Sequence, residues 1–129
     1  MDEQAALALF QFSQRWVALG MVDKALLAQM VSRWESGVDP HPEHYRNWAF
    51  NVFVQRNRPL SAELALALYE LGEGDPDQSF GGSMMVHIVH LRECPIELLH
   101  RALTSGRAHL ERAARRRLEA GPTSGQNQS

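Results

Sequence analysis

Residues 39–95 read DPHPEHYRNWAFNVFVQRNRPLSAELALALYELGEGDPDQSFGGSMMVHIVHLRECP and carry one arrangement of prolines twice. Asp39-Pro40 is followed by Pro59 nineteen residues after its proline, and Asp75-Pro76 is followed by Pro95 at the same distance. A repeating unit that cannot bury its apolar face alone must stack on the next one, so the pattern predicts a structural repeat of about 36 residues. The same offset pairs five further positions: Trp48 with Met84, Phe50 with Val86, Val52 with Ile88, Phe53 with Val89 and Arg56 with Arg92.

Apolar residues recur at helical spacing through most of the chain, and no stretch of useful length has the alternation of a strand. Two adjacent glycines, Gly81 and Gly82, each disfavour helix by about 1 kcal/mol relative to alanine, so the fifth helix is expected to begin late, near Ser83. The sequence therefore predicts an all-α fold of about seven helices, in which three stacked helical hairpins and a C-terminal capping helix form a short α-solenoid. The expected helices span about 2–19, 23–36, 43–56, 61–73, 83–92, 95–104 and 107–120, and the first six pair in sequence order.

Length and composition fit one globular domain. The chain has 129 residues, of which 44% are hydrophobic and 22% charged, so it can bury a sizeable core. We expect one helical-repeat domain over residues 1–120 and a flexible polar tail over 121–129. The single cysteine, Cys94, leaves no partner for a disulfide or for a cysteine-based metal site.

The segment Arg92-Glu93-Cys94-Pro95-Ile96-Glu97-Leu98-Leu99 resembles the turn that joins the two helices in HEAT-like and leucine-rich-variant repeats. In those repeats a proline and a glutamate open the second helix ahead of a leucine pair. The resemblance implies an α-solenoid that serves as a binding surface, and it transfers no catalytic residue to this chain.

The candidate partner-binding site is an acidic turn. Four carboxylates occur within eight residues around a glycine-rich stretch, next to one large apolar side chain: Glu70, Glu73, Asp75, Asp77 and Phe80. Such a turn can simply be a charged connector, but it can also dock a basic partner, since rim charges steer association. We expect Phe80 to be at least partly exposed, with the four carboxylates forming a negative rim beside it.

The alternative site is the basic last helix. Residues 99–129 contain six basic and two acidic residues, against seven basic and thirteen acidic in residues 1–98. This helix can cap the stack as a solvated element, or its arginines can contact the phosphates of a nucleic acid. The arginines that carry this alternative are Arg107, Arg112, Arg115 and Arg116.

Metal binding and catalysis receive less support from the sequence. His87 and His90 are three residues apart, as are Glu97 and His100, so antiparallel neighbours would bring four ligands together. The helical zinc signature, with two histidines four residues apart and a glutamate between them, is absent. No nucleophile elbow or phosphate-cradling loop is present either, and we expect no enzyme, metal, cofactor or small-molecule substrate.

The N-terminus lacks a basic region followed by an apolar run, so we expect no secretory signal and a cytoplasmic protein. No apolar stretch is long enough to cross a membrane. In size, acidity and expected helical content the chain is similar to bacterial immunity or inhibitor proteins, which cover the site of a toxin or an enzyme. We therefore expect a non-catalytic protein-binding module whose partner has a basic surface, and the alternative is a HEAT-like nucleic-acid-associated protein.

Overall fold

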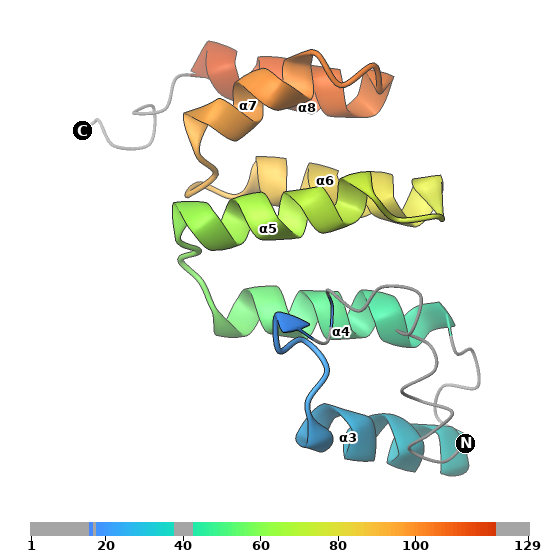
Figure 1. Ribbon diagram of the computed structural model, residues 1–129. Helices are drawn as coiled ribbons and strands as arrows, with labels where there is room; N and C mark the ends of the chain where they lie inside the picture. The colour runs from blue at the N-terminus through green and yellow to red at the C-terminus, as the bar shows by residue number, and fades with distance from the viewer. Residues whose placement is uncertain (1–15, 17, 38–42, 121–129) are drawn as a thin grey trace. The chain divides into compact units, whose positions relative to one another are not determined.

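The computed structural model describes residues 16, 18–37 and 43–120 (Figure 1). This part of the chain contains helices and no strand, which confirms the all-α prediction for it. Its six helices are α3 (Lys24–Glu35), α4 (Glu43–Arg56), α5 (Ala62–Glu73), α6 (Gln78–His90), α7 (Ile96–Leu103) and α8 (Ala108–Ala120). The helix expected over 2–19 and the tail expected over 121–129 lie outside the described residues. None of the described helices has both the length and the apolar character needed to cross a bilayer.

The chain divides into two compact units, Met1–Arg58 and Pro59–Ser129. In the first unit, Gly20 and Gly37 have positive φ angles of 83° and 73° and lie before and after α3. Asp23 caps this helix, because its Oδ1 accepts a hydrogen bond of 2.8 Å from the backbone N–H of Leu26. Among the residues of this unit that the structure describes, the buried apolar ones are Trp16, Met21, Val22, Leu26, Leu27, Met30, Ala49, Phe50 and Val54.

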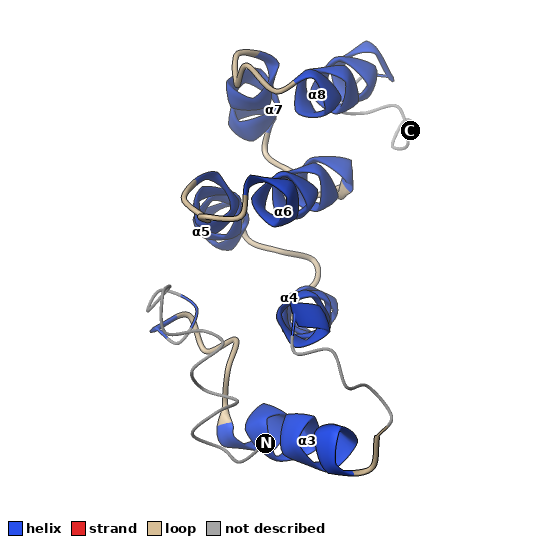
Figure 2. Ribbon diagram, turned by 90° about the vertical axis from the view of Figure 1, so that its right-hand side faces the viewer, coloured by secondary structure: helices blue, strands red, loops and turns tan. Residues whose placement is uncertain are grey.

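The second unit consists of two helical hairpins. α5 lies along α6, α7 lies along α8, and α6 also packs against α8 (Figure 2). α6 and α7 make little contact beyond the link that joins them. The largest fully buried side chains of this unit come from three of its helices and form its core: Leu68, Tyr69, Met84, Met85, Ile88 and Leu110.

This pairing differs from the predicted one, in which the fifth and sixth helices form a hairpin. The tight connection within a hairpin is the glycine-bearing turn at residues 74–77, whereas Pro95 lies in a link between hairpins. Leu91 and Pro95 both have extended ψ angles, of 141° and 145°, so the backbone of this link leads away from α6.

The 36-residue register is not kept by the helices that follow the two prolines. Ser61 caps α5, with its Oγ 3.1 Å from the backbone N of Leu64, so Pro59 precedes the cap by two residues. Pro95 is itself the residue at the start of α7, which has 8 residues where α5 has 12. Because the prolines occupy different positions relative to their helices, the predicted repeat is not confirmed as a regular one.

α6 begins at Gln78 and not near Ser83, so the expected late start is wrong. Asp77 caps the helix, its Oδ1 accepting a hydrogen bond of 3.1 Å from the backbone N–H of Phe80. The helix includes Gly81, whose backbone crosses that of Gly72 on α5 so closely that a Cβ added to Gly81 would lie 2.2 Å from the Gly72 carbonyl oxygen. The packing of two backbones against each other offsets the poor helix propensity of glycine, which is why the propensity argument failed.

The C-terminal end of α6 is held by an arginine of α8. Arg117 Nη1 donates hydrogen bonds of 2.6 Å to the Leu91 carbonyl and 3.2 Å to the Val89 carbonyl. Nη2 donates a longer one, of 3.4 Å, to the Arg92 carbonyl. These carbonyls lie at the end of a helix, where backbone acceptors lack partners within the helix and the dipole favours a cation. One member of the basic helix therefore has a structural role.

We expect Arg117→Ala to lower the free energy of unfolding by about 2 kcal/mol, the usual range for hydrogen bonds to a charged group. Arg117→Lys keeps the charge but loses the forked donor geometry, so it should recover only part of this stability. The matched control is Arg116→Ala, because Arg116 is exposed on the same helix. Urea unfolding checks the prediction, and equal midpoints for the Arg116 and Arg117 variants would contradict it.

Candidate functional site

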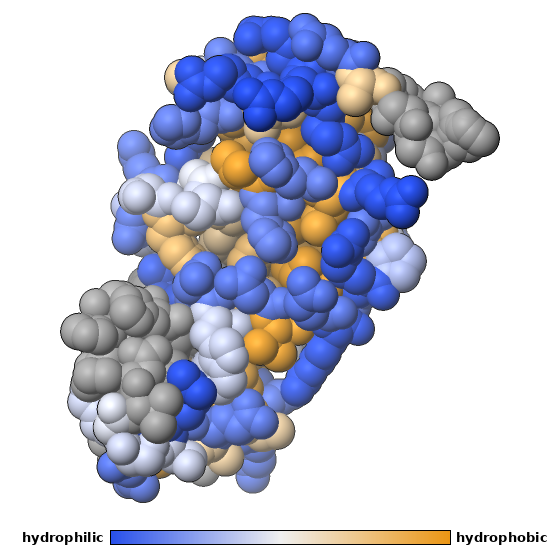
Figure 3. Space-filling model, turned by 180° about the vertical axis from the view of Figure 1, so that it is seen from behind, coloured by the Kyte–Doolittle hydropathy of each residue, from blue (hydrophilic) through white to orange (hydrophobic). Residues whose placement is uncertain are grey.

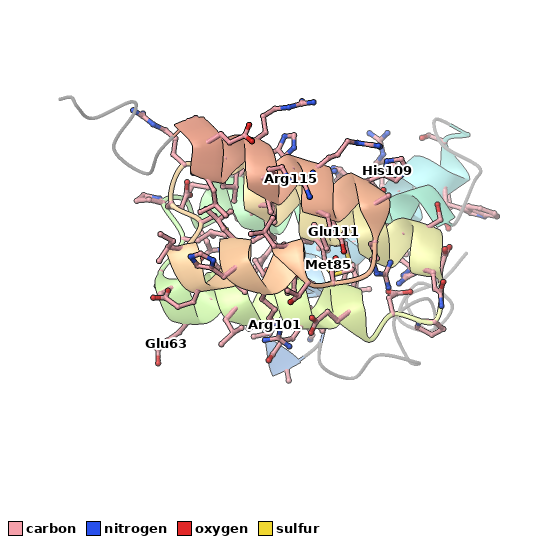
Figure 4. The ribbon with its side chains drawn as sticks, turned by 90° about the horizontal axis from the view of Figure 1, so that it is seen from above. Glu63, Met85, Arg101, His109, Glu111 and Arg115 are labelled. Carbon is pink, nitrogen blue, oxygen red and sulfur yellow. The ribbon has the colours of Figure 1, made fainter. Side chains whose placement is uncertain are left out.

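The structure uses most of the predicted acidic site for internal contacts. Arg101 of α7 donates to Glu73 from Nη2 at 2.6 Å and from Nε at 3.1 Å, and to Glu70 from Nη1 at 3.3 Å. In Figure 4 the Arg101 side chain reaches from α7 toward α5. Two of the four carboxylates are therefore paired with a cation of the same unit.

The other two carboxylates build the turn before α6. Asp75 is only 7% exposed, and its Oδ1 accepts a hydrogen bond of 2.9 Å from the backbone N–H of Asp77. Asp77 caps α6, and Phe80 is half-buried in the first turn of that helix. Phe80 is thus partly exposed as expected, whereas the place given to Asp75 in the negative rim is wrong, because its carboxylate is buried. The physical reason is that a helix start needs acceptors for its unpaired N–H groups.

A groove of about 890 Å³ lies between α6 and the start of α8 and was not predicted. α6 supplies one wall because residues three and four apart lie on the same side of a helix. The other wall consists of Arg107, just before α8, and of His109 and Leu110 in the first turn of α8. The residues that line the groove are Gln78, Ser79, Gly82, Ser83, Val86, His87, His90, Arg107, His109 and Leu110.

The groove is rich in hydrogen-bond donors and lacks acidic side chains. Among its lining residues, all of which the structure describes, there are three histidines and one arginine but no carboxylate. The Arg107 Nη1 donates a hydrogen bond of 3.1 Å to the Gln78 carbonyl, which holds the guanidinium at the edge of the groove. The arrangement suits an anionic group, since a low-dielectric hollow strengthens the attraction between opposite charges.

A second arginine reaches the groove through His109. Arg112 Nη2 lies 3.0 Å from His109 Nδ1. Because a guanidinium only donates, His109 Nδ1 accepts this hydrogen bond and its proton is on Nε2. Arg112 is exposed and is not itself among the lining residues, so it adds to the site only through its contact with His109.

The arginines of the nucleic-acid alternative have different environments. Arg107 is half-buried at the groove, whereas Arg112, Arg115 and Arg116 are exposed on α8. Arg115 and Arg116 follow Arg112 by three and four residues, so both lie near its side of the helix. Figure 4 shows Arg115 and His109 on the same helix, and in Figure 3 hydrophilic colours cover the upper end of the second unit. These arginines therefore form an exposed basic row that begins at the groove.

The predicted histidine cluster is brought together only in part. His87 and His90 both line the groove, but their neighbour there is His109 of α8. His100 lies exposed on α7 and does not line it. Within the described part of the chain, no three histidine, cysteine, aspartate or glutamate side chains are placed to hold a metal ion.

Sequence reasoning noted His87, His90 and Arg107 separately and missed the groove itself. The available signal was the spacing of His87 and His90 together with Arg107 and His109 after the next glycine-bearing turn. It was assigned to the wrong pair of helices because the hairpins were expected to pair differently.

No family model, curated protein or solved structure matches the chain. The function proposed below is therefore argued from the geometry of the described residues.

Proposed function

We propose that this chain is a non-catalytic protein-binding helical module and that its partner contacts the groove between α6 and α8. The observation that carries the proposal is a hollow of about 890 Å³ lined by three histidines, an arginine and no carboxylate, in a chain with fifteen acidic residues. A groove with a polar rim and a few convergent polar groups is the usual form of a binding site. An inhibitor or immunity protein that covers the site of a toxin or enzyme is one role within this class.

The acidic turn contributes less to this proposal than the sequence implied. Glu70 and Glu73 are paired with Arg101, and Asp75 is buried in the turn, so little of their charge is presented to a partner. A partner that uses the groove would bring acidic groups, not the basic surface expected from the sequence.

The environment of Cys94 does not favour a role for its thiol as a nucleophile. Burial, with a smaller contribution from Glu93, raises the pKa of the thiol to about 11 against the opposing effect of Arg117. The thiol is therefore protonated at neutral pH and a poor nucleophile, since the thiolate is the reactive form.

Site-specific crosslinking tests the proposal. Ser83 is exposed in the groove and Glu63 is exposed at the start of α5, so S83C and E63C each accept a photo-crosslinker. In cells that express the full chain, S83C should form a covalent adduct with a discrete protein and E63C should not. The unsubstituted chain controls for labelling at Cys94. Equal adducts from both sites, or none from S83C, would contradict the groove as the binding site.

The second candidate function is nucleic-acid binding, and the exposed row of Arg112, Arg115 and Arg116 favours it. Backbone phosphates would contact this row, and affinity would fall steeply with salt as counterions are released. Replacing Arg112 and Arg116 with glutamine should then abolish a salt-dependent shift of DNA or RNA at micromolar protein. A shift that survives these changes would contradict this candidate.

A further inference from the structure

We infer that the groove between α6 and α8 binds an acidic peptide segment of the partner and that its imidazoles take up protons when the segment binds. The inference rests on the proposed function, because it names the chemistry of the partner at that site. Binding at this site is then regulated by pH, because proton uptake accompanies it.

The charges around the groove favour an anion. α6 contributes His87 and His90, and the start of α8 contributes His109, with Arg107 at one edge and Arg112 behind His109.

The two remaining charged side chains of α8 that lie nearby are turned to other partners. Glu111 Oε2 accepts a hydrogen bond of 2.9 Å from the backbone N–H of Gly106. Arg117 is directed to the carbonyls at the end of α6. Glu111 therefore does not compete with the carboxylate of a bound peptide, and Arg117 does not neutralise it.

The other lining residues fit a peptide better than a nucleic acid. Leu110 is buried and Val86 half-buried, which gives the groove an apolar floor for an aliphatic side chain. The exposed hydroxyls of Ser79 and Ser83 can bond to peptide carbonyl or carboxylate oxygens. No phenylalanine, tyrosine or tryptophan is among the described lining residues, so the large rings that stack most extensively on bases are missing from this groove.

The pH dependence follows from linkage. A carboxylate within about 4–6 Å favours the charged form of an imidazole by 1–3 pKa units. The complex then binds more protons than the free protein, so lowering the pH favours the complex over the range in which imidazoles titrate. Below about pH 4 the glutamates of the segment become protonated themselves and the attraction is lost.

The experiment uses the full chain and a fluorescent synthetic peptide in which glutamate alternates with leucine. Fluorescence anisotropy should give a dissociation constant about fivefold lower at about pH 5.5 than at about pH 7.5, for one imidazole whose pKa rises by one unit from about 6.5 on binding. A peptide in which glutamine replaces glutamate should bind much more weakly at both pH values. Calorimetry in buffers of different ionisation enthalpy measures the proton uptake directly.

Histidine variants assign the effect to the groove. His90 is exposed, so H90Q should fold normally and reduce both the proton uptake and the pH dependence. The matched control is H100Q, because His100 is exposed on α7 outside the groove and should leave both unchanged.

Several results would overturn the inference. The first two are no binding of the glutamate peptide at millimolar concentration and binding that is independent of pH. The others are equal effects of H100Q and H90Q, and tighter binding of a lysine–leucine peptide or of a single-stranded oligonucleotide. If S83C crosslinks to a partner while one of these results is obtained, the proposed function stands and only the acidic ligand is wrong. If S83C gives no adduct, the proposed function itself fails.

Discussion

Replacing Gly81 with alanine should lower the free energy of unfolding by about 3 kcal/mol, near the upper end of the usual cost of overpacking. The same replacement at the next residue, Gly82→Ala, should leave stability unchanged or raise it by up to about 1 kcal/mol. Two adjacent glycines in one helix are thus expected to respond with opposite sign.

The difference arises from what each added methyl group meets. At Gly81 a Cβ would lie 2.2 Å from the Gly72 carbonyl oxygen and 3.1 Å from the Asp75 Cβ, so the backbones of α5 and α6 must move apart. At Gly82 the nearest atom is Arg107 Nη1 at 3.3 Å, the end of a flexible side chain that can shift. Only the second site can therefore gain from the better helix propensity of alanine.

Urea or thermal unfolding of the two variants checks the prediction. Gly72→Ala provides a second test of the same crossing, because its Cβ would lie 2.7 Å from the Gly81 carbonyl oxygen and should also destabilise the fold. If G81A were as stable as G82A, the close approach of α5 and α6 would not exist in solution.

The second large effect is expected at alkaline pH, where the folded protein should lose about 4 kcal/mol of stability by about pH 12. Burial, followed by the nearby charge of Glu73, raises the pKa of Tyr69 from 10.0 to about 12 against the opposing effect of Arg101. The pKa of Cys94 rises from 9.0 to about 11, mainly through burial. Both side chains are almost inaccessible to solvent, at 0% and 8% exposure.

The sign follows from proton binding. Above the ordinary pKa of each group the unfolded chain releases its proton while the folded chain retains it. Ionisation therefore stabilises the unfolded state relative to the folded state, and the free energy of unfolding falls. The stability is fully present below about pH 9 and falls as the pH rises through 9–11 for the thiol and 10–12 for the phenol. A shift of two pKa units corresponds to roughly 2 to 3 kcal/mol for each group.

The chain offers a clean test because it has a single lysine, Lys24, and twelve arginines that stay charged over this range. Tyr69→Phe should remove about half of the alkaline loss. It should cost little near neutral pH, since no hydrogen-bond partner of the Tyr69 hydroxyl is found for the described part of the chain. Cys94→Ala should remove most of the remaining loss. Unfolding midpoints measured from pH 8 to pH 12 check this, and an unchanged slope in both variants would show that neither group remains protonated in the folded state.

The sequence by itself determined the helical class and several helix boundaries of the described part. Asp23 and Ser61 cap helices as their positions predict, and Gly20, Gly37 and Gly106 take the positive φ angles that suit a helix end. These features depend on residues within a few positions of each other, so local rules are sufficient to find them.

Tertiary structure decided where α6 begins and which helices pair. Gly81 and Gly82 disfavour helix locally, yet α6 contains both, because the backbone contact with Gly72 depends on residues of another helix. The prolines predicted interruptions correctly, but they could not show whether an interruption lies within a hairpin or between two hairpins.

The candidate site depended on that same choice of partners. His87 and His90 line a groove because the packing of α8 against α6 places Arg107 and His109 beside them. The charges of Glu70 and Glu73 are neutralised because α7 places Arg101 next to them. Composition and spacing identify which charged groups the chain has. Contacts between helices decide which charged groups neutralise one another and which remain available to a partner. The reason is that electrostatic energy depends on separation in space and not along the sequence.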